Sequence, residues 1–529
     1  MTNPVLPGFR PDPSICRAGD DFYLVTSTFE YFPGLPVQHS RDLLNWHLIG
    51  HVLDRPEQLN LDGVRSSGGL YAPTIRWHRG VFYVVCTLIG APPGRPGGNF
   101  VVTATDPAGP WSDPVWLGEP ESFDPSLFFD DVDGGAWFCA TRPDPAAPIA
   151  GGTEIWVRRF DPQALRLVGP EQVIWHGALV DAVWAEAPHL YRSPDGDLLL
   201  LIAEGGTAHD HAVTCARAKL ATGPYRNNPR NPVLTHRHLG ARSPVVGAGH
   251  ADLVTAADGT WWAVLLAIRA RREADDDTYH YTLGRETFLA EVSWEDGWPV
   301  FNPGIGALRT DQAGPDVPAA PWPPVPERDD FDRDRLGPGW SYLRTPSAGL
   351  VSLSERPGWL ALHPQPEGTE DAGCPAFVAR PQETWDFRAT GLLDFDPADA
   401  GPVAGIMLRQ SERFSLRLLI CSGTSAGVTS GSLPGSRRAR VVRRFAGVDE
   451  VVAERPVPDG LLRLTVAGAG LDYTFSVNDL VLATVDGRVL STTVAGGFTG
   501  TMIGPYAARP DRPGAAPSAF WDWFEYRWL

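Results

Sequence analysis

The sequence predicts an all-β protein in which a five-bladed β-propeller is followed by a C-terminal, jelly-roll-like β-sandwich. Three observations lead to this fold class. A short motif recurs five times along the N-terminal region, turn-forming residues separate the apolar runs, and a Pro-rich stretch divides this region from a second one with a different pattern. Because 529 residues exceed the size of one ordinary domain, we expect at least two.

The recurring motif predicts a propeller over residues 1–301. It begins at Asp12, Ala72, Asp124, Ala187 and His250, so that successive copies lie 60, 52, 63 and 63 residues apart. In each copy an apolar residue follows three places later, and a turn containing Gly then leads to a second apolar run, which is typical of a β-hairpin. Five copies, each with room for four strands, favour a five-bladed propeller.

Acidic residues stand at or next to the start of this motif in three copies. They are Asp12, Asp124 and Glu186, the last of which lies one place before the aligned position. Since the first strand of each blade lines the central channel, we expect these acids and His250 to face one axis. Turn formation alone would explain a single Asp-Pro motif, but several in register predict a site. Converging carboxylates are typical of glycoside hydrolysis, which needs an acid and a base.

A Pro-rich linker and a sandwich are expected after the propeller. Residues 302–328 contain seven prolines and few apolar runs, which indicates a stiff connection that runs over a surface. From 329 to 529, short alternating runs separated by turns predict the β-sandwich. The aromatic-rich run 520–529 is expected to be its closing strand, because a free tail would rarely carry so many aromatic residues.

Composition excludes several classes of partner. The net charge of −18 argues against nucleic acid and anionic membranes, which both attract basic surfaces. No run of about 18 apolar residues suggests a membrane span. The first residues have neither the basic start nor the apolar core of a signal peptide, so we expect a cytoplasmic protein. The six cysteines form no CxxC pair and predict neither a zinc site nor a redox site.

The motifs together resemble those of glycoside hydrolase family 43. The similarity lies in residues 3–15, 26–34, 39–43, 123–128, 186–191, 203–206, 249–252 and 283–287, and it is greatest to the two-domain β-xylosidase type, which has a C-terminal sandwich. As a set these motifs are specific, whereas Asp-Pro-Ser alone would not be. The linker and the second region resemble that type in their general sequence pattern but not in specific motifs.

The resemblance implies roles for four residues. Asp12 is similar to the general base that activates water, and Glu186 to the general acid that protonates the leaving oxygen. Asp124 is similar to the third carboxylate, which raises the pKa of the acid and orients it. Arg285 resembles an arginine that contacts the sugar, where it would donate paired hydrogen bonds. An inverting enzyme of this kind needs roughly 6.5–9.5 Å between base and acid to admit water.

The resemblance also implies how the pocket is lined. Phe29 and Tyr71 match positions in its apolar wall. His250 resembles a channel histidine that contacts substrate or water, or a divalent ion through water. No cofactor is expected to be required, and if a metal binds, we expect calcium coordinated largely by water. Arg76 is interpreted more simply, as an ordinary strand residue.

Three residues depart from the family pattern. Ala187 replaces a frequent Gly beside the expected acid, which is a small change. Tyr71 stands where the β-xylosidase type has Trp, and Met502 stands where that type has an aromatic residue that closes the pocket from the sandwich. The last two changes affect the pocket wall, so they bear on the choice of sugar more than on the chemistry.

The sequence therefore predicts an exo-acting, inverting glycosidase that releases xylose from the non-reducing ends of short β-1,4-xylo-oligosaccharides. The main alternative is α-L-arabinofuranosidase activity, alone or alongside, since a few contacts worth about 1–3 kcal/mol could decide between the two sugars. A more distant alternative is a non-catalytic, carbohydrate-binding propeller, because propellers host many functions. Homo-oligomers are a further expectation from the family resemblance.

Overall fold

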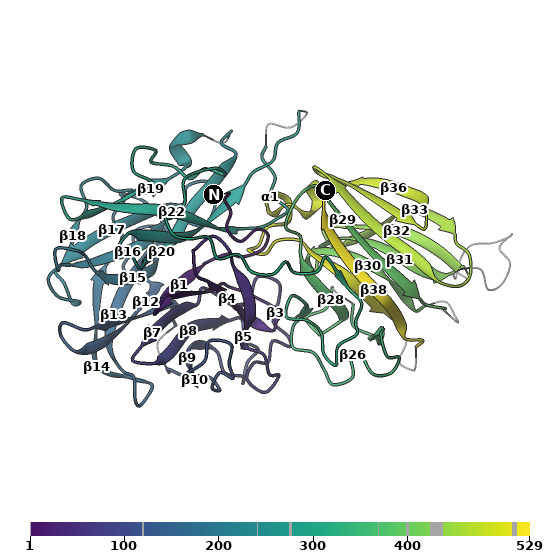
Figure 1. Ribbon diagram of the computed structural model, residues 1–529, viewed down its shortest axis with the longest axis horizontal. Helices are drawn as coiled ribbons and strands as arrows, with labels where there is room; N and C mark the ends of the chain where they lie inside the picture. The colour runs from purple at the N-terminus through teal and green to yellow at the C-terminus, as the bar shows by residue number, and fades with distance from the viewer. Residues whose placement is uncertain are drawn as a thin grey trace.

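The computed structural model describes residues 2–118, 121–240, 242–274, 278–368, 370–397, 401–423, 437–509 and 516–529. These residues form two β domains that lie side by side, a propeller coloured purple to teal and a sandwich coloured green to yellow (Figure 1). None of the helices in these ranges is long and apolar enough to cross a membrane.

The first domain is the expected five-bladed propeller. Each blade among the described residues is an antiparallel sheet that begins with its innermost strand, and neighbouring inner strands contact one another around the channel. The short strands β6 (Gly69–Leu70) and β19 (Leu234–Thr235) add to two of the blades, and η1 (Arg237–Leu239) follows the second of them. From the channel outward the blades are β1 (Ser14–Ala18), β2 (Asp21–Val25), β4 (Gly34–Ser40), β5 (His47–Leu53); β7 (Thr74–His78), β8 (Val81–Ile89), β9 (Gly98–Ala104), β10 (Val115–Trp116); β11 (Phe123–Asp130), β12 (Gly135–Pro143), β13 (Thr153–Asp161), β14 (Arg166–Trp175); β15 (Glu186–Arg192), β16 (Leu198–Glu204), β17 (Ala212–Ala218), β18 (Arg226–Asn227); and β20 (Val245–Thr255), β21 (Trp261–Arg269), β22 (Glu286–Glu295), β23 (Trp298–Phe301).

The second domain is a sandwich of two antiparallel sheets around an apolar core. The run expected to close it forms β38 (Ala519–Trp528), which pairs on both sides within the first sheet. That sheet contains β26 (Val351–Ser352), β27 (Leu360–Leu362), β38, β29 (Phe387–Asp394), β34 (Leu462–Ala469), β35 (Asp472–Val477) and β36 (Leu480–Asp486), with β24 (Arg328–Asp329) also on β38. The second sheet contains β3 (Tyr31–Phe32), β25 (Ser341–Leu343), β28 (Ala376–Pro381), β37 (Met502–Ala508), β30 (Val403–Ser411), β31 (Phe414–Ser422), β32 (Arg437–Phe445) and β33 (Val448–Pro456). The helical turns η2 (Gly487–Leu490) and α1 (Thr492–Ala495) precede β37.

The connection between the domains lies against the first blade. Residues 302–327, all of which the structure describes, form no strand between β23 and β24. The ring of Trp322 stacks on His47 with centroids 5.2 Å apart, and the Ala320 amide donates to the Asp42 carboxylate at 2.8 Å. The linker is therefore held on the propeller surface by specific contacts.

A strand from the propeller continues a sheet of the sandwich. The short strand β3, between β2 and β4 in the chain, pairs with β25, so that Tyr342 faces Phe32 and Leu343 faces Tyr31. The backbone hydrogen bonds of one sheet thus cross the domain boundary. This pairing fixes the sandwich next to the segment that begins with Phe29.

Buried charges reinforce the same boundary. Arg409 of the sandwich is fully buried and donates to Glu30 at 3.3 Å and to the Tyr31 hydroxyl at 3.0 Å. Next to it, the fully buried Arg344 donates to the Val64 carbonyl of the propeller at 2.5 Å and to Glu412 of its own domain at 2.8 Å. A buried guanidinium is tolerated only when it is paired and hydrogen-bonded, so these contacts require the two domains to stay together.

We expect Arg409→Ala to destabilise the protein by about 3–5 kcal/mol, because Glu30 would keep a buried charge without its partner. The measurement is the unfolding midpoint in urea and on heating. As a control, Arg443→Ala removes an exposed ion pair with Glu450 on the same sheet and should cost less than about 1 kcal/mol. Equal midpoints for the two variants would contradict the role of the buried cluster.

Candidate active site

A pocket of about 350 Å³ opens at the end of the propeller channel. All seven site residues suggested by the sequence line it, and they come from separate blades and from the segments between them. The residues that line it are Asp12, Phe29, Tyr71, Ala72, Ile89, Phe123, Asp124, Trp184, Glu186, Gly206, Thr207, His250, Arg285 and Phe498. Phe498 is the one member of this set that belongs to the sandwich.

A repeated backbone irregularity turns the inner strands toward this pocket. Asp12, Asp124, Ala187 and His250, which share the aligned position of the sequence motif, have φ values of 53°, 50°, 52° and 54°. Such values are uncommon for residues with a Cβ atom. The pairing register also shifts here in three blades, for example between Glu186 and His189. Bulges of this kind re-aim side chains, which explains how an acid one place out of register still reaches the pocket.

Asp12 is held by a guanidinium and a hydroxyl. Arg285 Nη1 donates to Asp12 Oδ1 at 2.9 Å, and Ser27 Oγ donates to Asp12 Oδ2 at 2.6 Å. The same Nη1 also donates to Thr207 Oγ1 at 2.9 Å. Asp12 therefore has a fixed orientation and a positively charged partner within the pocket.

Asp124 and Glu186 lie in a different electrostatic setting. Burial raises the pKa of Asp124, and the neighbouring Asp12 carboxylate raises it further. Burial likewise raises the pKa of Glu186, with Asp124 as the next cause, while Arg285 partly opposes the shift. Since two nearby carboxyls ionise together only at high cost, this pair retains a proton at higher pH than ordinary acids do.

Aromatic rings form one wall of the pocket. Phe29 lies 5.2 Å from Tyr71 and 5.8 Å from Phe498, measured between ring centroids. The Arg285 guanidinium lies over Phe29 and Phe498, at 5.6 and 5.5 Å. The Tyr71 hydroxyl donates to the Ser67 carbonyl at 2.8 Å, which fixes its ring. The wall is apolar toward the pocket and anchored behind it.

The expectation for Met502 was wrong. Met502 is buried in the core behind the wall and does not line the pocket, whereas Phe498, four residues earlier, does. The loop before β37 reaches the propeller because Gly284 and Gly500 meet without side chains: a Cβ atom on Gly500 would lie 2.4 Å from the Leu283 carbonyl oxygen. This close approach lets Arg285 Nη2 donate to the Phe498 carbonyl at 3.3 Å.

The sequence analysis missed seven further residues of the pocket, of which Phe123, Trp184, Thr207 and Phe498 bear most on its shape and contacts. Phe123 and Trp184 lie at its rim with ring centroids 6.5 Å apart, and Trp184 is 42% exposed. Both stand within two residues of an acid in the sequence, which is the signal that could have suggested them. Thr207 and Phe498 carry no such signal, because only the fold brings them to Arg285.

Among the described residues, the surroundings of His250 do not form a calcium site made of protein oxygens. Its Nδ1 lies 3.9 Å from Asp12 Oδ1, and burial lowers the pKa of His250, which favours the neutral ring. The two nearest carboxylates are engaged, Asp12 by Arg285 and Asp252 by Arg76. Calcium prefers several oxygen ligands, and both guanidinium groups repel a cation. Protein ligation of calcium therefore does not fit this channel.

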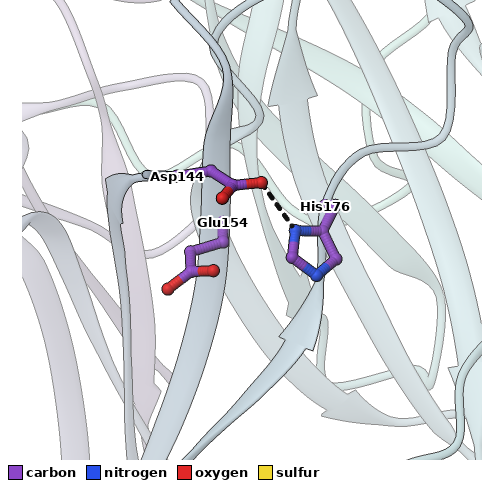
Figure 2. A group of neighbouring side chains, drawn as sticks. All are labelled: Asp144, Glu154 and His176. Carbon is purple, nitrogen blue, oxygen red and sulfur yellow. Dashed lines mark hydrogen bonds and ion pairs between the residues drawn. The ribbon is translucent and has the colours of Figure 1, made fainter. Parts of the chain in front are cut away.

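A second group of potential metal ligands lies outside the pocket, on the third blade (Figure 2). Asp144, Glu154 and His176 place ligand atoms within 4.8 Å of one another, and His176 Nδ1 lies 3.2 Å from Asp144 Oδ2. However, Arg142 Nε donates to Glu154 Oε1 at 2.6 Å. Because this guanidinium already compensates the Glu154 charge, we interpret the group as ion pairs.

Both domains match known families. Residues 1–299 match the family described as Glycosyl hydrolases family 43, and residues 328–527 match the Beta xylosidase C-terminal Concanavalin A-like domain. The chain belongs to glycosyl hydrolase family 43. It is therefore a glycoside hydrolase, and its sandwich is of the concanavalin A-like type.

Relatives in family 43 cover the whole chain. The xylosidase/arabinosidase of Butyrivibrio fibrisolvens is 41% identical over 517 residues, which span 96% of this chain and 95% of the relative. The non-reducing end alpha-L-arabinofuranosidase of Bacteroides ovatus is 39% identical over 535 residues, with 100% and 94% covered. The solved xylan beta-1,4-xylosidase from Bacillus halodurans has a TM-score of 0.89 at 32% identity over the full length of both chains.

Because Asp12 and Asp252 are already paired with arginines, we expect removal of divalent ions to leave hydrolysis unchanged. The measurement is the rate on an aryl glycoside after dialysis against EDTA, with and without added calcium chloride. A loss of more than about tenfold that calcium restores would contradict this expectation and indicate a water-coordinated ion next to His250.

Proposed function

We propose that the protein removes single xylose units from the non-reducing ends of short β-1,4-xylo-oligosaccharides, with inversion at the anomeric carbon. The observation that best supports this is one compact pocket that holds three carboxyls and Arg285 and is walled by an aromatic residue of the second domain. A pocket of about 350 Å³ suits the end of a chain better than its middle. The relatives named as xylosidases support xylose as the sugar.

In this proposal Asp12 is the general base. Its carboxylate accepts a proton from a water molecule, whose oxygen attacks the anomeric carbon from the face opposite the leaving group. Arg285 and Ser27 keep the carboxylate oriented for this transfer. Arg285 also presents donors to the pocket, where a sugar hydroxyl can accept them.

Glu186 is then the general acid. As the bond between the anomeric carbon and the glycosidic oxygen breaks, the Glu186 proton moves to that oxygen, and the shortened chain leaves as an alcohol. The acid must be protonated near neutral pH, and its burial and the neighbouring Asp124 both raise its pKa in that direction. Asp124 acts here through Glu186 and does not exchange a proton with the substrate.

The second candidate is α-L-arabinofuranosidase activity, alone or in addition. It is supported by the relatives named xylosidase/arabinosidase and alpha-L-arabinofuranosidase. The same base, acid and arginine would serve both pentoses, and the wall formed by Phe29, Tyr71 and Phe498 would decide between them. A few contacts, worth about 1–3 kcal/mol, are enough for such a preference.

Proton NMR of a fresh digest of xylobiose tests the main proposal, with 4-nitrophenyl α-L-arabinofuranoside assayed in parallel. We expect α-xylose to appear first, because inversion converts the β linkage into the α anomer. Asp12→Ala is the control. Its rate should fall about 10²–10⁴-fold, because no carboxylate remains to accept the proton of the attacking water.

Three outcomes would overturn parts of this proposal. Early β-xylose would exclude Asp12 as the base and indicate a covalent intermediate. Rapid cleavage of the arabinoside without any cleavage of xylobiose would favour the second candidate. Full activity of Asp12→Ala on either substrate would show that the reacting groups lie elsewhere.

Asp124→Asn tests the electrostatic role of the third carboxyl. Removing its negative charge lowers the pKa of Glu186, so the acid loses its proton at a lower pH. We expect the alkaline limb of the kcat/KM profile to move down by about one pH unit. Asp130→Asn, at the other end of the same strand, is the control and should leave the limb in place. An alkaline limb that stays fixed in Asp124→Asn would contradict the assignment.

A further inference from the structure

One guanidinium in the channel beneath the pocket reaches all five inner strands. Arg76, on β7, donates from Nε to the Leu127 carbonyl of β11 at 3.2 Å and from Nη1 to the Ile15 carbonyl of β1 at 3.3 Å. Its Nη2 donates to His189 Nδ1 of β15 at 2.9 Å and to Asp252 Oδ1 of β20 at 3.0 Å. Arg76, which was expected to be an ordinary strand residue, therefore connects the five inner strands that surround the channel.

Asp252 is the partner that completes this link. It is fully buried, and its Oδ2 accepts from Arg76 Nη1 at 2.8 Å, from Ser14 Oγ at 2.6 Å and from the Ile15 amide at 3.0 Å. The Tyr191 hydroxyl donates to its Oδ1. Burial alone would raise the pKa of Asp252, but Arg76 and the other donors hold it well below the usual value. Asp252 is therefore a charged, fully engaged carboxylate.

These contacts lie a short distance along the strands that carry the pocket acids. Ser14, the first residue of β1, follows Asp12 by two residues, and His189 on β15 follows Glu186 by three. These contacts therefore lie within two or three residues of the reacting groups along the chain. They join the strand of the base to the strand of the acid without entering the pocket.

The contact on the acid strand is a hydrogen bond to a neutral ring. Arginine can only donate, so His189 Nδ1 accepts from Arg76. Burial lowers the pKa of His189 to about 3, which keeps the ring uncharged at the pH of any ordinary assay. The link to β15 therefore does not switch with pH in that range.

We propose that Arg76 and Asp252 are a positioning pair that sets the placement of Asp12 relative to Glu186. The inference rests on the proposed roles of those two acids. The planar guanidinium has enough donors to reach several strands at once, and Asp252 fixes its plane through two oxygens. Loosening this link shifts β1 against β15 and changes the gap in which water must fit. A misplacement of about 1 Å at reacting groups can lower a rate about 10²-fold.

The primary test is the steady-state kinetics of Asp252→Asn. We expect kcat to fall about 10²-fold while KM changes by less than about threefold, because the aromatic wall and Arg285 are left in place. Asp130→Asn is the matched control. It breaks a buried pair with Arg192, whose Nη2 donates to Asp130 at 2.5 Å. This pair joins the last residues of β11 and β15, away from the acids near the beginnings of the same strands. Asp130→Asn should lower the Tm in a similar way but leave kcat unchanged.

Arg76→Lys separates geometry from charge. Lysine keeps the positive charge beside Asp252 but cannot reproduce the planar fork of donors. A positioning role predicts a kcat nearly as low as that of Asp252→Asn, whereas a purely electrostatic role predicts the parent rate. The parent kcat in Arg76→Lys would overturn the proposal, and so would an equal loss of kcat in Asp130→Asn.

If Asp252→Asn does not fold, Ser14→Ala provides the milder test. It removes one hydroxyl that joins β1 to Asp252, and we expect kcat to fall about tenfold at unchanged KM. A kcat equal to that of the parent would overturn the proposal. The activity of the unaltered protein tests the proposed function separately. The ratio of the variant's kcat to the parent's kcat, on whichever pentoside is cleaved, tests the positioning role of Arg76 and Asp252.

Discussion

Burial of charge at the propeller axis is the constraint on which the rest of the site depends. Five inner strands converge there, so ionised groups can persist only where each finds a partner. Arg76 compensates Asp252 in the channel, and Arg285 compensates Asp12 in the pocket. Among the residues that the structure describes, neither Asp124 nor Glu186 forms an ion pair, and burial raises the pKa of both, although Arg285 partly opposes the shift. Hydrolysis requires one ionised carboxylate as the base and one protonated carboxyl as the acid, and the difference in pairing favours this division.

The second domain completes the pocket. Phe498 comes from the loop before β37, and its backbone carbonyl accepts from Arg285. The domain boundary holds this loop in place through the pairing of β3 with β25 and through the buried Arg409. The propeller alone would lack one ring of the wall and one contact of the arginine. The sandwich therefore contributes a residue to the candidate pocket.

The differences between expectation and structure have a common physical cause. Phe498 and Thr207 reach the pocket through contacts between segments that are far apart in the chain, and no local pattern reports such contacts. Met502 belongs to a strand rather than to the loop that reaches the pocket, so its position in the sequence was misleading. Arg76 stands in a strand, as expected, but the direction of its side chain follows from the curvature of the whole propeller.

The fold class, the repeat and the positions of the three acids along the chain follow from local patterns of residues. These features are local: turns, alternating runs and Pro-rich segments specify strands, and a period near 60 residues specifies blades. Which groups share a low-dielectric space depends instead on how distant segments pack together. Charge pairing, pKa shifts and the shape of the wall depend on distances between Asp12, Arg285, Glu186 and Phe498, and closure of the propeller against the sandwich sets those distances.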